Sequence, residues 1–355
     1  MKVSYPDYNF WQDKKVLITG HSGFKGGWLS LWLKRMNAHI AGISLAPSSH
    51  PNLFNLAGIE SVCESYFCDI RDTTRLANLI NRIQPEIVFH LAAQALVRSS
   101  YQEPINTFST NIMGTANILE ALRNKTNIRV AIMITTDKVY VNNESYWPYR
   151  ETDPLGGHDP YSASKAASEM IIDSYRKAFL SDQGVAVASC RAGNVIGGGD
   201  WSIDRLIPDA IRAWQNGSVL EIRCPEAIRP WQHVLEPLAG YLCLAQQLWK
   251  ESELSGAYNF GPLPQQASTV RRVIEIANKA YGQGEITYKE SSQNLYEAHW
   301  LTLEITKARQ CLGFQPRFSL EEAIQTTMAW YYAQHKGVNA RTLCEQDIAT
   351  YEDLE

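Results

Sequence analysis

Two residues of types that can move a proton stand close together in the middle of this sequence. Tyr161 and Lys165 are four residues apart, so on a helix the phenol and the ammonium share one face. A positive neighbour favours phenolate, and we therefore expect Lys165 to lower the pKa of Tyr161 from about 10 toward neutrality. Such a phenolate removes a proton from a hydroxyl group while a hydride leaves the same carbon. The alternative is a solvated helix start, because this spacing also arises by chance.

A second reactive pair lies shortly before the predicted helix that carries the first pair. Thr136, Asp137 and Lys138 follow the apolar run Val130 to Ile134, which reads as a strand. The carboxyl ends of parallel strands are where doubly wound folds bind ligands. There Asp137 can act as an acid, and Lys138 as a base if burial lowers its pKa. Alone, these residues would equally suit a surface turn with an ion pair.

A glycine-rich segment near the amino terminus predicts a phosphate-binding turn. It follows the apolar run Lys15 to Thr19 and opens the helix-like segment Phe24 to Met36. Glycines allow a tight turn that approaches a pyrophosphate, whose charge is favoured by the free N–H groups of a helix start. The spacing is G-x-x-G-x-x-G, in place of the more usual G-x-G-x-x-G. The residues expected to contact a dinucleotide here are Gly20, Ser22, Gly23, Phe24, Lys25 and Gly26.

The sequence leaves the choice between NAD and NADP open. An acidic residue about 20 positions beyond the turn would bind the adenosine ribose of NAD, yet Ile40 to Leu56 contains neither Asp nor Glu. The same stretch has no Arg for a 2′-phosphate, and Lys25 is the nearby cation. Asp69 and Ile70 are candidates for the adenine edge, although an Asp at this position is also a common helix N-cap.

Strand-like and helix-like segments alternate over the first half of the chain. This alternation predicts an α/β fold, a Rossmann-like doubly wound parallel sheet with helices on both faces. We expect a dinucleotide-binding domain at 1–193, a smaller substrate-binding lobe at 194–355, and a return to the first domain at about 234–262. The expected elements are strands at 15–19, 39–44, 87–90, 130–134 and 185–190, and helices at 24–36, 73–83, 105–123 and 161–180.

Composition excludes several classes of protein. The 355 residues are 45% hydrophobic and carry a formal net charge of -4, so nucleic acid is not expected as a partner. No stretch is apolar and long enough for a signal peptide or a membrane span. The seven cysteines are scattered without metal-ligand spacing. We expect a cytoplasmic protein without a metal, whose cysteines are buried thiols and whose tryptophans and methionines belong to the core.

Five motifs occur in the order typical of extended short-chain dehydrogenases, which the chain resembles. Two longer motifs add a narrower resemblance to the CDP-glucose 4,6-dehydratases among the nucleotide-sugar dehydratases. The five are Gly20 to Gly26, His90 to Ala93, Asn111 to Thr115, Thr136 to Lys138 and Tyr161 to Lys165, and the two longer ones are Arg191 to Trp201 and Ile228 to Pro237. The resemblance covers about residues 10 to 330.

The resemblance implies a redox-neutral reaction on a nucleotide sugar with NAD as cofactor. Tyr161, helped by Lys165 and Thr136, would deprotonate the 4-hydroxyl as C4 gives up a hydride; Lys138 and Asp137 would assist loss of water across C5 and C6, and the hydride would return to C6. It also implies a homodimer through the helices at 105–123 and 161–180, and a role in deoxysugar and O-antigen synthesis. The further contacts it implies are Leu91, Ala92 and Ala93 for the cofactor, and Gln94, Asn194, Arg205, Arg229 and His299 for the substrate.

The chain departs from the family pattern beside the expected sugar site. Val139 stands where the family usually has Cys, residues 140–147 differ, and Ala163 replaces the usual Asn. A different hexose or nucleotide therefore stays possible. The alternatives are another nucleotide-hexose dehydratase, a nucleotide-sugar 4-epimerase, and a dinucleotide-sensing protein without catalysis. The intact pair Tyr161 and Lys165 argues against the sensor.

Overall fold

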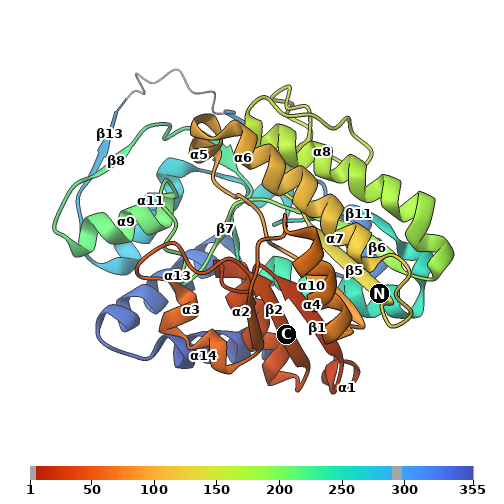
Figure 1. The fold of residues 1–355 in the computed structure, drawn as a ribbon. Helices are drawn as coiled ribbons and strands as arrows, with labels where there is room; N and C mark the ends of the chain where they lie inside the picture. The colour runs from red at the N-terminus through yellow and green to blue at the C-terminus, as the bar shows by residue number, and fades with distance from the viewer. Residues whose placement is uncertain (1–4, 290–297, 355) are drawn as a thin grey trace.

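A seven-stranded parallel sheet forms the centre of the protein, in a computed structural model that describes residues 5–289 and 298–354 (Figure 1). Its strand order is β11-β6-β5-β4-β1-β2-β3, and every neighbouring pair is parallel. The strands are β1 (Lys15–Thr19), β2 (His39–Ser44), β3 (Glu64–Phe67), β4 (Ile87–His90), β5 (Val130–Ile134), β6 (Ala186–Ala192) and β11 (Gly256–Phe260). The predicted fold class is confirmed.

Helices cover both faces of this sheet because its central strands are apolar on both sides. Val16 and Ile18 of β1 point into one core, with α2 (Phe24–Arg35) and α10 (Leu235–Lys250). Leu17, between them in sequence, points into the opposite core. The helices of that second core are α4 (Thr73–Ile83), α7 (Gly114–Leu122) and α8 (Pro160–Tyr175). Alternation along one strand thus separates the two helical layers.

The strand order reverses between β1 and β4, which places a crevice at their carboxyl ends. From β1 the chain moves outward through β2 to β3, then crosses back to β4 and continues through β5 and β6. Open parallel sheets bind ligands at such a reversal point. The glycine-rich turn after β1 and the polar residues after β4, β5 and β6 therefore share one edge of the sheet.

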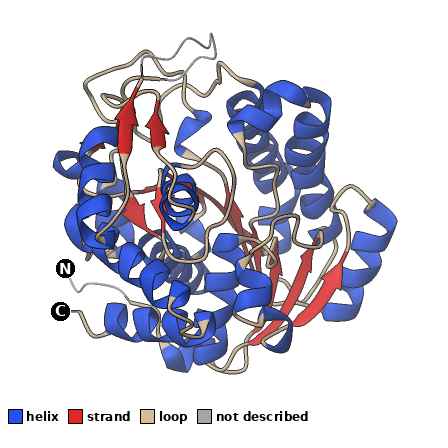
Figure 2. Ribbon diagram, turned by 90° about the vertical axis from the view of Figure 1, so that its left-hand side faces the viewer, coloured by secondary structure: helices blue, strands red, loops and turns tan. Residues whose placement is uncertain are grey.

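Much of the chain beyond residue 193 builds a smaller lobe over this edge. In Figure 1 the lobe lies at the left, and in Figure 2 two of its strands stand apart from the main sheet. Its elements are α9 (Leu206–Gln215), β8 (Leu220–Ile222) paired with β13 (Ile286–Tyr288), β9 (Ile228–Arg229) paired with β12 (Ser268–Thr269), and α11 (Val270–Tyr281). The parallel pair β7 (Val195–Ile196) and β10 (Gln232–His233) connects it to the sheet.

The last helices join the lobe to the first layer. α13 (Leu320–His335) packs on α11, and α14 (Ala340–Glu352) packs on α2. Shorter elements complete the fold. They are the helices α1 (Tyr8–Trp11), α3 (Leu53–Leu56), α5 (Val97–Gln102), α6 (Pro104–Phe108) and α12 (Thr306–Leu312), and short 3-10 turns at Ile59–Ser61, Asp137–Val139, Ser181–Gln183, Ser252–Leu254 and Pro264–Gln266.

Several local predictions need correction. The two long helices expected at 105–123 and 161–180 each contain a π-helical segment, Ser109–Met113 before α7 and Arg176–Leu180 after α8. Trp147 is 82% exposed, Met170 57% and Met113 54%, and Cys311 is also exposed, so none of these four belongs to the core. A single π-helical turn adds too few residues to be recognised from residue types. The exposure of a Trp or Cys depends on which segments pack over it, which residue type alone does not show.

Candidate active site

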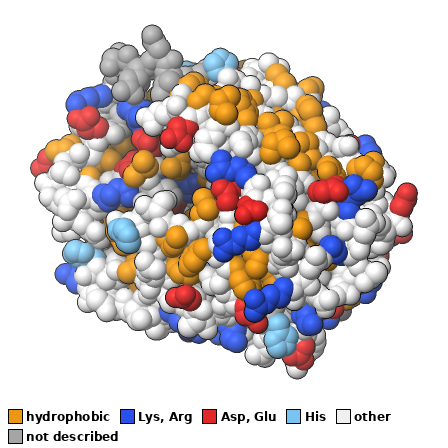
Figure 3. Space-filling model, in the orientation of Figure 1, with side chains coloured by type: hydrophobic (Ala, Val, Ile, Leu, Met, Phe, Trp, Pro, Cys, Tyr) orange, Lys and Arg blue, Asp and Glu red, His pale blue; other side chains and the backbone are white. Residues whose placement is uncertain are grey.

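A cavity of about 1790 Å³ lies between the carboxyl edge of the sheet and the lobe. Figure 3 shows a hollow in this face of the molecule, with basic and acidic side chains around it. Small-molecule pockets commonly measure about 300–1,000 Å³, so this cavity has room for more than one ligand of that size. All of the candidate site residues named from the sequence line it: Gly20, Ser22, Gly23, Phe24, Lys25, Gly26, Asp69, Ile70, Leu91, Ala92, Ala93, Gln94, Thr136, Asp137, Lys138, Tyr161, Lys165, Asn194, Arg205, Arg229 and His299.

The glycine-rich turn is built so that side chains do not fit in it. Gly20 has a φ of +79°, a conformation that favours glycine, and a Cβ there would lie 2.8 Å from the backbone nitrogen of Ala92. A Cβ on Gly26 would lie 2.2 Å from the carbonyl oxygen of Gly20. Gly23 is the N-cap of α2 and caps it without a side chain. The turn therefore leaves the start of α2 open to a phosphate, as a dinucleotide requires.

Gly26→Ala is expected to weaken dinucleotide binding by at least about tenfold, because the methyl group would lie 2.2 Å from the Gly20 carbonyl oxygen and the turn must open to admit it. Titration of the protein with NAD, followed by calorimetry, measures this loss. Gly27→Ala is the matched control. The atom nearest to its Cβ would be the end of the Leu53 side chain, at 3.0 Å, which can move aside, and Ile59 would be at an ordinary contact distance of 3.7 Å. Equal affinity in the two variants would contradict the assignment of the turn.

The segment expected to receive the adenosine does not take the alternative role of a helix N-cap. Asp72 caps α4, and Asp69 forms a 2.6 Å ion pair with Arg71. This ion pair lowers the pKa of Asp69. Both Asp69 and Ile70 line the cavity beyond β3.

His21, inside the glycine-rich turn, was not predicted as a site residue. Its ring lies against Gly42 of β2, where a Cβ would be 2.2 Å from the imidazole, and its Nε2 is 2.6 Å from the Ser65 hydroxyl. Burial lowers the pKa of His21 to about 4, so the ring is neutral at pH 7. Gly42 is the feature of the sequence that points to this contact, because a glycine inside a strand often marks a place where another group approaches the backbone closely.

Tyr161 and Lys165 lie on the buried face of α8, as their spacing predicts. Asp159 caps the helix, and Tyr161 and Lys165 are 8% and 5% exposed. Lys165 donates a hydrogen bond from Nζ to the Ile134 carbonyl at 3.2 Å, which ties the helix to the end of β5. Burial lowers the pKa of Lys165 to about 8, against the opposing charge of Glu169.

The predicted lowering of the Tyr161 pKa is wrong for the protein by itself. Burial raises the pKa of Tyr161 to about 12, although a hydrogen bond with Thr136 and the charge of Arg205 pull it down. Desolvation disfavours the phenolate, and here this effect outweighs the positive neighbours. The spacing of Tyr161 and Lys165 predicts that the two side chains share one helix face, but it does not predict how deeply they are buried.

Asp137 and Lys138 stand at the end of β5, across the cavity edge from α8. Thr136 donates from Oγ1 to Asp137 Oδ1 at 3.0 Å, while Asp137 Oδ2 is buried and has no hydrogen-bond partner among the described residues. Burial raises the pKa of Asp137, opposed by Lys138, Thr136, Arg229 and Lys25. The carboxyl group therefore holds a proton more tightly than an ordinary Asp. Lys138 is half-buried in the cavity wall.

Three basic side chains bring positive charge to the same cavity. Arg229 of β9 is 3% exposed and donates to the carbonyls of Ile228 and Ala298. Arg205, at the start of α9, donates to Asp200 Oδ2 at 2.9 Å. Lys25 is part of the glycine-rich turn, and burial lowers its pKa to about 8. Two guanidinium groups that line one cavity suit a diphosphate.

The other substrate candidates have less direct geometry. Asn194 lies between β6 and β7, where its carbonyl accepts from the Gln232 N–H at 3.0 Å. Gln94 uses its side-chain amide on Leu96 and Thr107, so its polar atoms already have partners within the loop. His299 is exposed, and its backbone N–H donates to the Glu144 carboxylate at 3.0 Å. Their roles in binding stay predictions.

No group of three or more His, Cys, Asp and Glu side chains converges as a metal site within the described residues. Over the same residues, no helix is long and apolar enough to cross a membrane.

Comparison with known proteins gives a family match over most of the chain. The family model described as GDP-mannose 4,6 dehydratase matches residues 17–327. A curated relative, the CDP-glucose 4,6-dehydratase of Salmonella typhimurium, is 44% identical over 351 residues, which are 97% of this chain and 98% of the relative. The resemblance to this group noted in the sequence is confirmed.

Solved structures of low sequence identity share the fold. A UDP-glucose 4-epimerase from Thermotoga maritima with UDP-glucose superposes with a TM-score of 0.78 at 23% identity, covering 90% of this chain and 99% of that one. A UDP-glucose-4-epimerase from Stenotrophomonas maltophila with bound NAD has a TM-score of 0.79 at 20% identity, covering 92% and 100%.

Proposed function

Because the chain belongs to the GDP-mannose 4,6 dehydratase family, we propose that it converts CDP-glucose to CDP-4-keto-6-deoxyglucose with NAD as its cofactor. The similarity to the Salmonella typhimurium enzyme, over nearly the full length of both chains, supports the nucleotide and the hexose. The reaction has three parts: oxidation at C4, loss of water across C5 and C6, and reduction at C6.

The observation that carries this proposal is that two proton-transferring pairs face one cavity from different elements. Tyr161 and Lys165 come from the start of α8, and Asp137 and Lys138 come from the end of β5. An oxidation at one carbon needs one such pair. Elimination at neighbouring carbons needs a second pair, which approaches a different edge of the sugar ring.

The residues of the glycine-rich turn fit a dinucleotide. Cβ atoms at Gly20 and Gly26 would fill the space at the start of α2, and Leu91 to Ala93 lie next to this turn. When bound, NAD would accept a hydride from C4 of the sugar and return it to C6. Lys165 is the expected contact to the ribose of the nicotinamide end. Residues 40–56 contain no Asp or Glu. Discrimination between NAD and NADP therefore falls to Ser44 and the cavity residues after it.

In the proposed reaction the two pairs handle different proton transfers. The Tyr161 oxygen, next to the Thr136 hydroxyl, takes the proton of the 4-hydroxyl. The ketone formed at C4 then acidifies the proton on C5, which Lys138 removes. Asp137, whose pKa is raised by burial, donates a proton to the departing 6-hydroxyl, which leaves as water, and Lys138 returns its proton to C5 as C6 is reduced. Arg205 and Arg229 hold the diphosphate at the lobe.

A screen of CDP-, dTDP-, GDP- and UDP-glucose with the NAD-loaded enzyme tests the proposal. We expect mass spectrometry to show loss of water with CDP-glucose, and the 4-keto-6-deoxy product to absorb in alkali. A product of unchanged mass and inverted configuration at C4 would instead identify a nucleotide-sugar 4-epimerase, which has no need of Asp137 and Lys138 as acid and base. No product with any of the four, together with tight NAD binding, would favour a dinucleotide sensor.

We also propose a homodimer formed through α6, α7 and α8. Three exposed apolar side chains lie along these adjacent elements: Ile105 of α6 is 78%, Met170 of α8 is 57%, and Met113, in the π-helical segment just before α7, is 54% exposed. Figure 3 shows hydrophobic side chains gathered over this part of the surface. A patch of this kind marks a site of association. Cytoplasmic location and a role in O-antigen synthesis stay predictions.

Met170→Glu is expected to shift the protein from dimer to monomer, because a charge in the centre of an apolar interface must be buried without a partner. Light scattering at micromolar concentration measures the mass. Val219→Glu is the control, since Val219 is 46% exposed but lies in the lobe. A wild-type protein that is already monomeric would remove the dimer proposal.

A further inference from the structure

A third ionisable residue of α8 lies on the same face as the reactive pair. Glu169 follows Lys165 by four residues and Tyr161 by eight, so the three side chains stand on successive turns. Glu169 is 4% exposed. The reaction proposed above has no proton for it to transfer, and a buried carboxylate requires an explanation.

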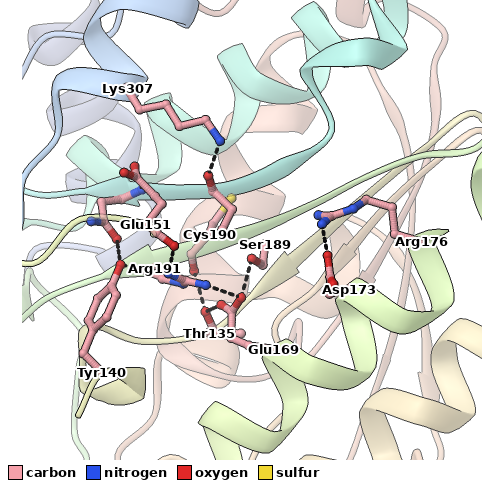
Figure 4. Close-up of polar contacts among 12 residues, drawn as sticks. Thr135, Tyr140, Glu151, Glu169, Asp173, Arg176, Ser189, Cys190, Arg191 and Lys307 are labelled. Carbon is pink, nitrogen blue, oxygen red and sulfur yellow. Dashed lines mark hydrogen bonds and ion pairs between the residues drawn. The ribbon is translucent and has the colours of Figure 1, made fainter. Parts of the chain in front are cut away.

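The Glu169 carboxylate is bound by three donors from two strands (Figure 4). Arg191 donates from Nη2 at 2.8 Å and Ser189 from its hydroxyl at 2.7 Å, both from β6. The hydroxyl of Thr135, at the end of β5, is the third donor. These donors and the charge of Arg191 keep the pKa of Glu169 below its usual range, so the group is an anion at neutral pH.

These contacts connect Glu169 to the acid and base of the site. Thr135 is followed directly by Thr136, Asp137 and Lys138. The residue before Thr135, Ile134, accepts the hydrogen bond from Lys165. Two charged side chains of α8, one turn apart, therefore hold two consecutive residues at the end of β5. A movement of α8 relative to β5 would change the distance between the two reactive pairs.

We propose that Glu169 is a positioning residue of this active site, which holds the β5 end through Thr135 and keeps the Lys165 ammonium charged. The kinetic part of this assignment rests on the proposed function, whereas the effect on the charge of Lys165 does not. The buried position of Lys165 favours the neutral amine, and Glu169 is the neighbour whose charge opposes this. A charged Lys165 is what the Tyr161 phenolate needs beside it.

Stability alone does not account for the ion pair of Glu169 and Arg191. Both side chains are 3% exposed, and a buried pair of this kind commonly contributes no more than a well-packed apolar pair of the same volume. Arg191 is further anchored by the Tyr140 hydroxyl at 2.9 Å and the Glu151 carbonyl at 3.2 Å. The anchoring fixes the carboxylate in one position, one helical turn from Lys165, and this serves placement of the charge more than stability.

The other groups near the two residues do not replace this charge. Next to Lys165, His90 is neutral because burial lowers its pKa to about 3, and Lys25 carries the same charge sign as Lys165. Next to Glu169, burial raises the pKa of the Cys190 thiol well above its usual range, so it is uncharged.

The first test titrates Lys165 directly and does not depend on activity. NMR of protein labelled with ¹³C-lysine follows the ε-carbon, and the signal that disappears in Lys165→Met identifies the residue. In Glu169→Gln we expect the midpoint to fall by about one pH unit from the wild-type value, because removal of a nearby negative charge disfavours the ammonium. At pH 7 the fraction of charged Lys165 then drops.

A second variant separates loss of the charge from exposure of Arg191 as an unpaired cation. Glu169→Gln with Arg191→Met removes both charges, so that no buried charge lacks a partner, and the Lys165 midpoint should still fall. Glu169→Asp keeps the charge, and we expect a midpoint near the wild-type value. A folded double variant whose Lys165 titrates as in wild type would overturn the electrostatic part of the proposal.

Kinetics test the positional part. Thr135→Val keeps the ion pair and removes one hydroxyl, and we expect kcat to fall about tenfold with little change in KM, while the Lys165 midpoint stays. In Glu169→Gln the alkaline limb of the kcat profile should move to lower pH by the same amount as the Lys165 midpoint. An unchanged kcat in Thr135→Val would overturn the positional part. A wild-type enzyme without turnover on any nucleotide sugar would refute the proposed function, yet the NMR titration would still decide the role of Glu169.

Discussion

Tyr161→Phe is expected to lower turnover by at least about 100-fold and to leave NAD binding close to wild type. The substitution deletes the phenol oxygen that takes the proton from the 4-hydroxyl, and proton transfer by a positioned side chain commonly contributes about 10²- to 10⁴-fold. It removes little volume from a site where Tyr161 is 8% exposed, so the cavity shape is preserved. The loss should therefore fall on kcat.

Steady-state kinetics with CDP-glucose, and a separate titration with NAD, measure the two quantities. Tyr175→Phe is the matched control, because Tyr175 lies on the same helix and its hydroxyl donates to Glu120 at the surface, at 3.1 Å. The control should turn over like wild type. Residual activity in Tyr161→Phe equal to that of the control would show that another group takes the proton.

The pKa of Tyr161 adds a condition to this mechanism. In the protein alone burial raises it to about 12, so at pH 7 the phenol is protonated. Tyr161 can therefore act as a base only if its phenol loses the proton once substrate and cofactor fill the cavity. Lys165 and Arg205 supply positive charge from the protein, and the nicotinamide ring of NAD would add to it.

The parts of the site that the sequence predicted are those formed by one strand, one turn and one helix. The glycine-rich turn between β1 and α2 follows from the order of an apolar run, three glycines and an apolar helix. The pair on α8 follows from a spacing of four residues, and Asp137 and Lys138 follow from their place after a buried strand. In each case the information lies within one continuous stretch of the sequence.

The parts that the sequence did not predict depend on distant elements. Glu169, Arg191 and Thr135 meet from α8, β6 and β5, and no local pattern relates them. The same holds for the sign of the Tyr161 pKa shift, which depends on how deeply the lobe covers the helix start. Asp69 and Asp72 illustrate a smaller limit: both precede α4, but only the distance to the helix N–H groups decides that Asp72 is its cap.

Lys138→Ala is expected to separate the oxidation from the elimination. Tyr161 and Lys165 start a helix, whereas Asp137 and Lys138 lie in the 3-10 turn that follows β5, so each pair can reach its own edge of the sugar ring. If Lys138 removes the proton from C5, its loss leaves the proton transfer at the 4-hydroxyl intact. The enzyme should then stop at the 4-ketohexose, and without an unsaturated intermediate the C6 position cannot be reduced.

A stopped reaction of this kind has a direct signal. On mixing Lys138→Ala, loaded with NAD, with CDP-glucose, we expect the near-ultraviolet absorbance of a reduced nicotinamide to rise and persist, while mass spectrometry detects no loss of water. In wild type the same absorbance should rise only transiently. Lys177→Ala serves as the control. Lys177 is 70% exposed in the π-helical segment after α8, does not line the cavity, and pairs with Asp173. Dehydration by Lys138→Ala at the wild-type rate would exclude Lys138 as the base, and Asp137 or a bound water would then have to remove the C5 proton.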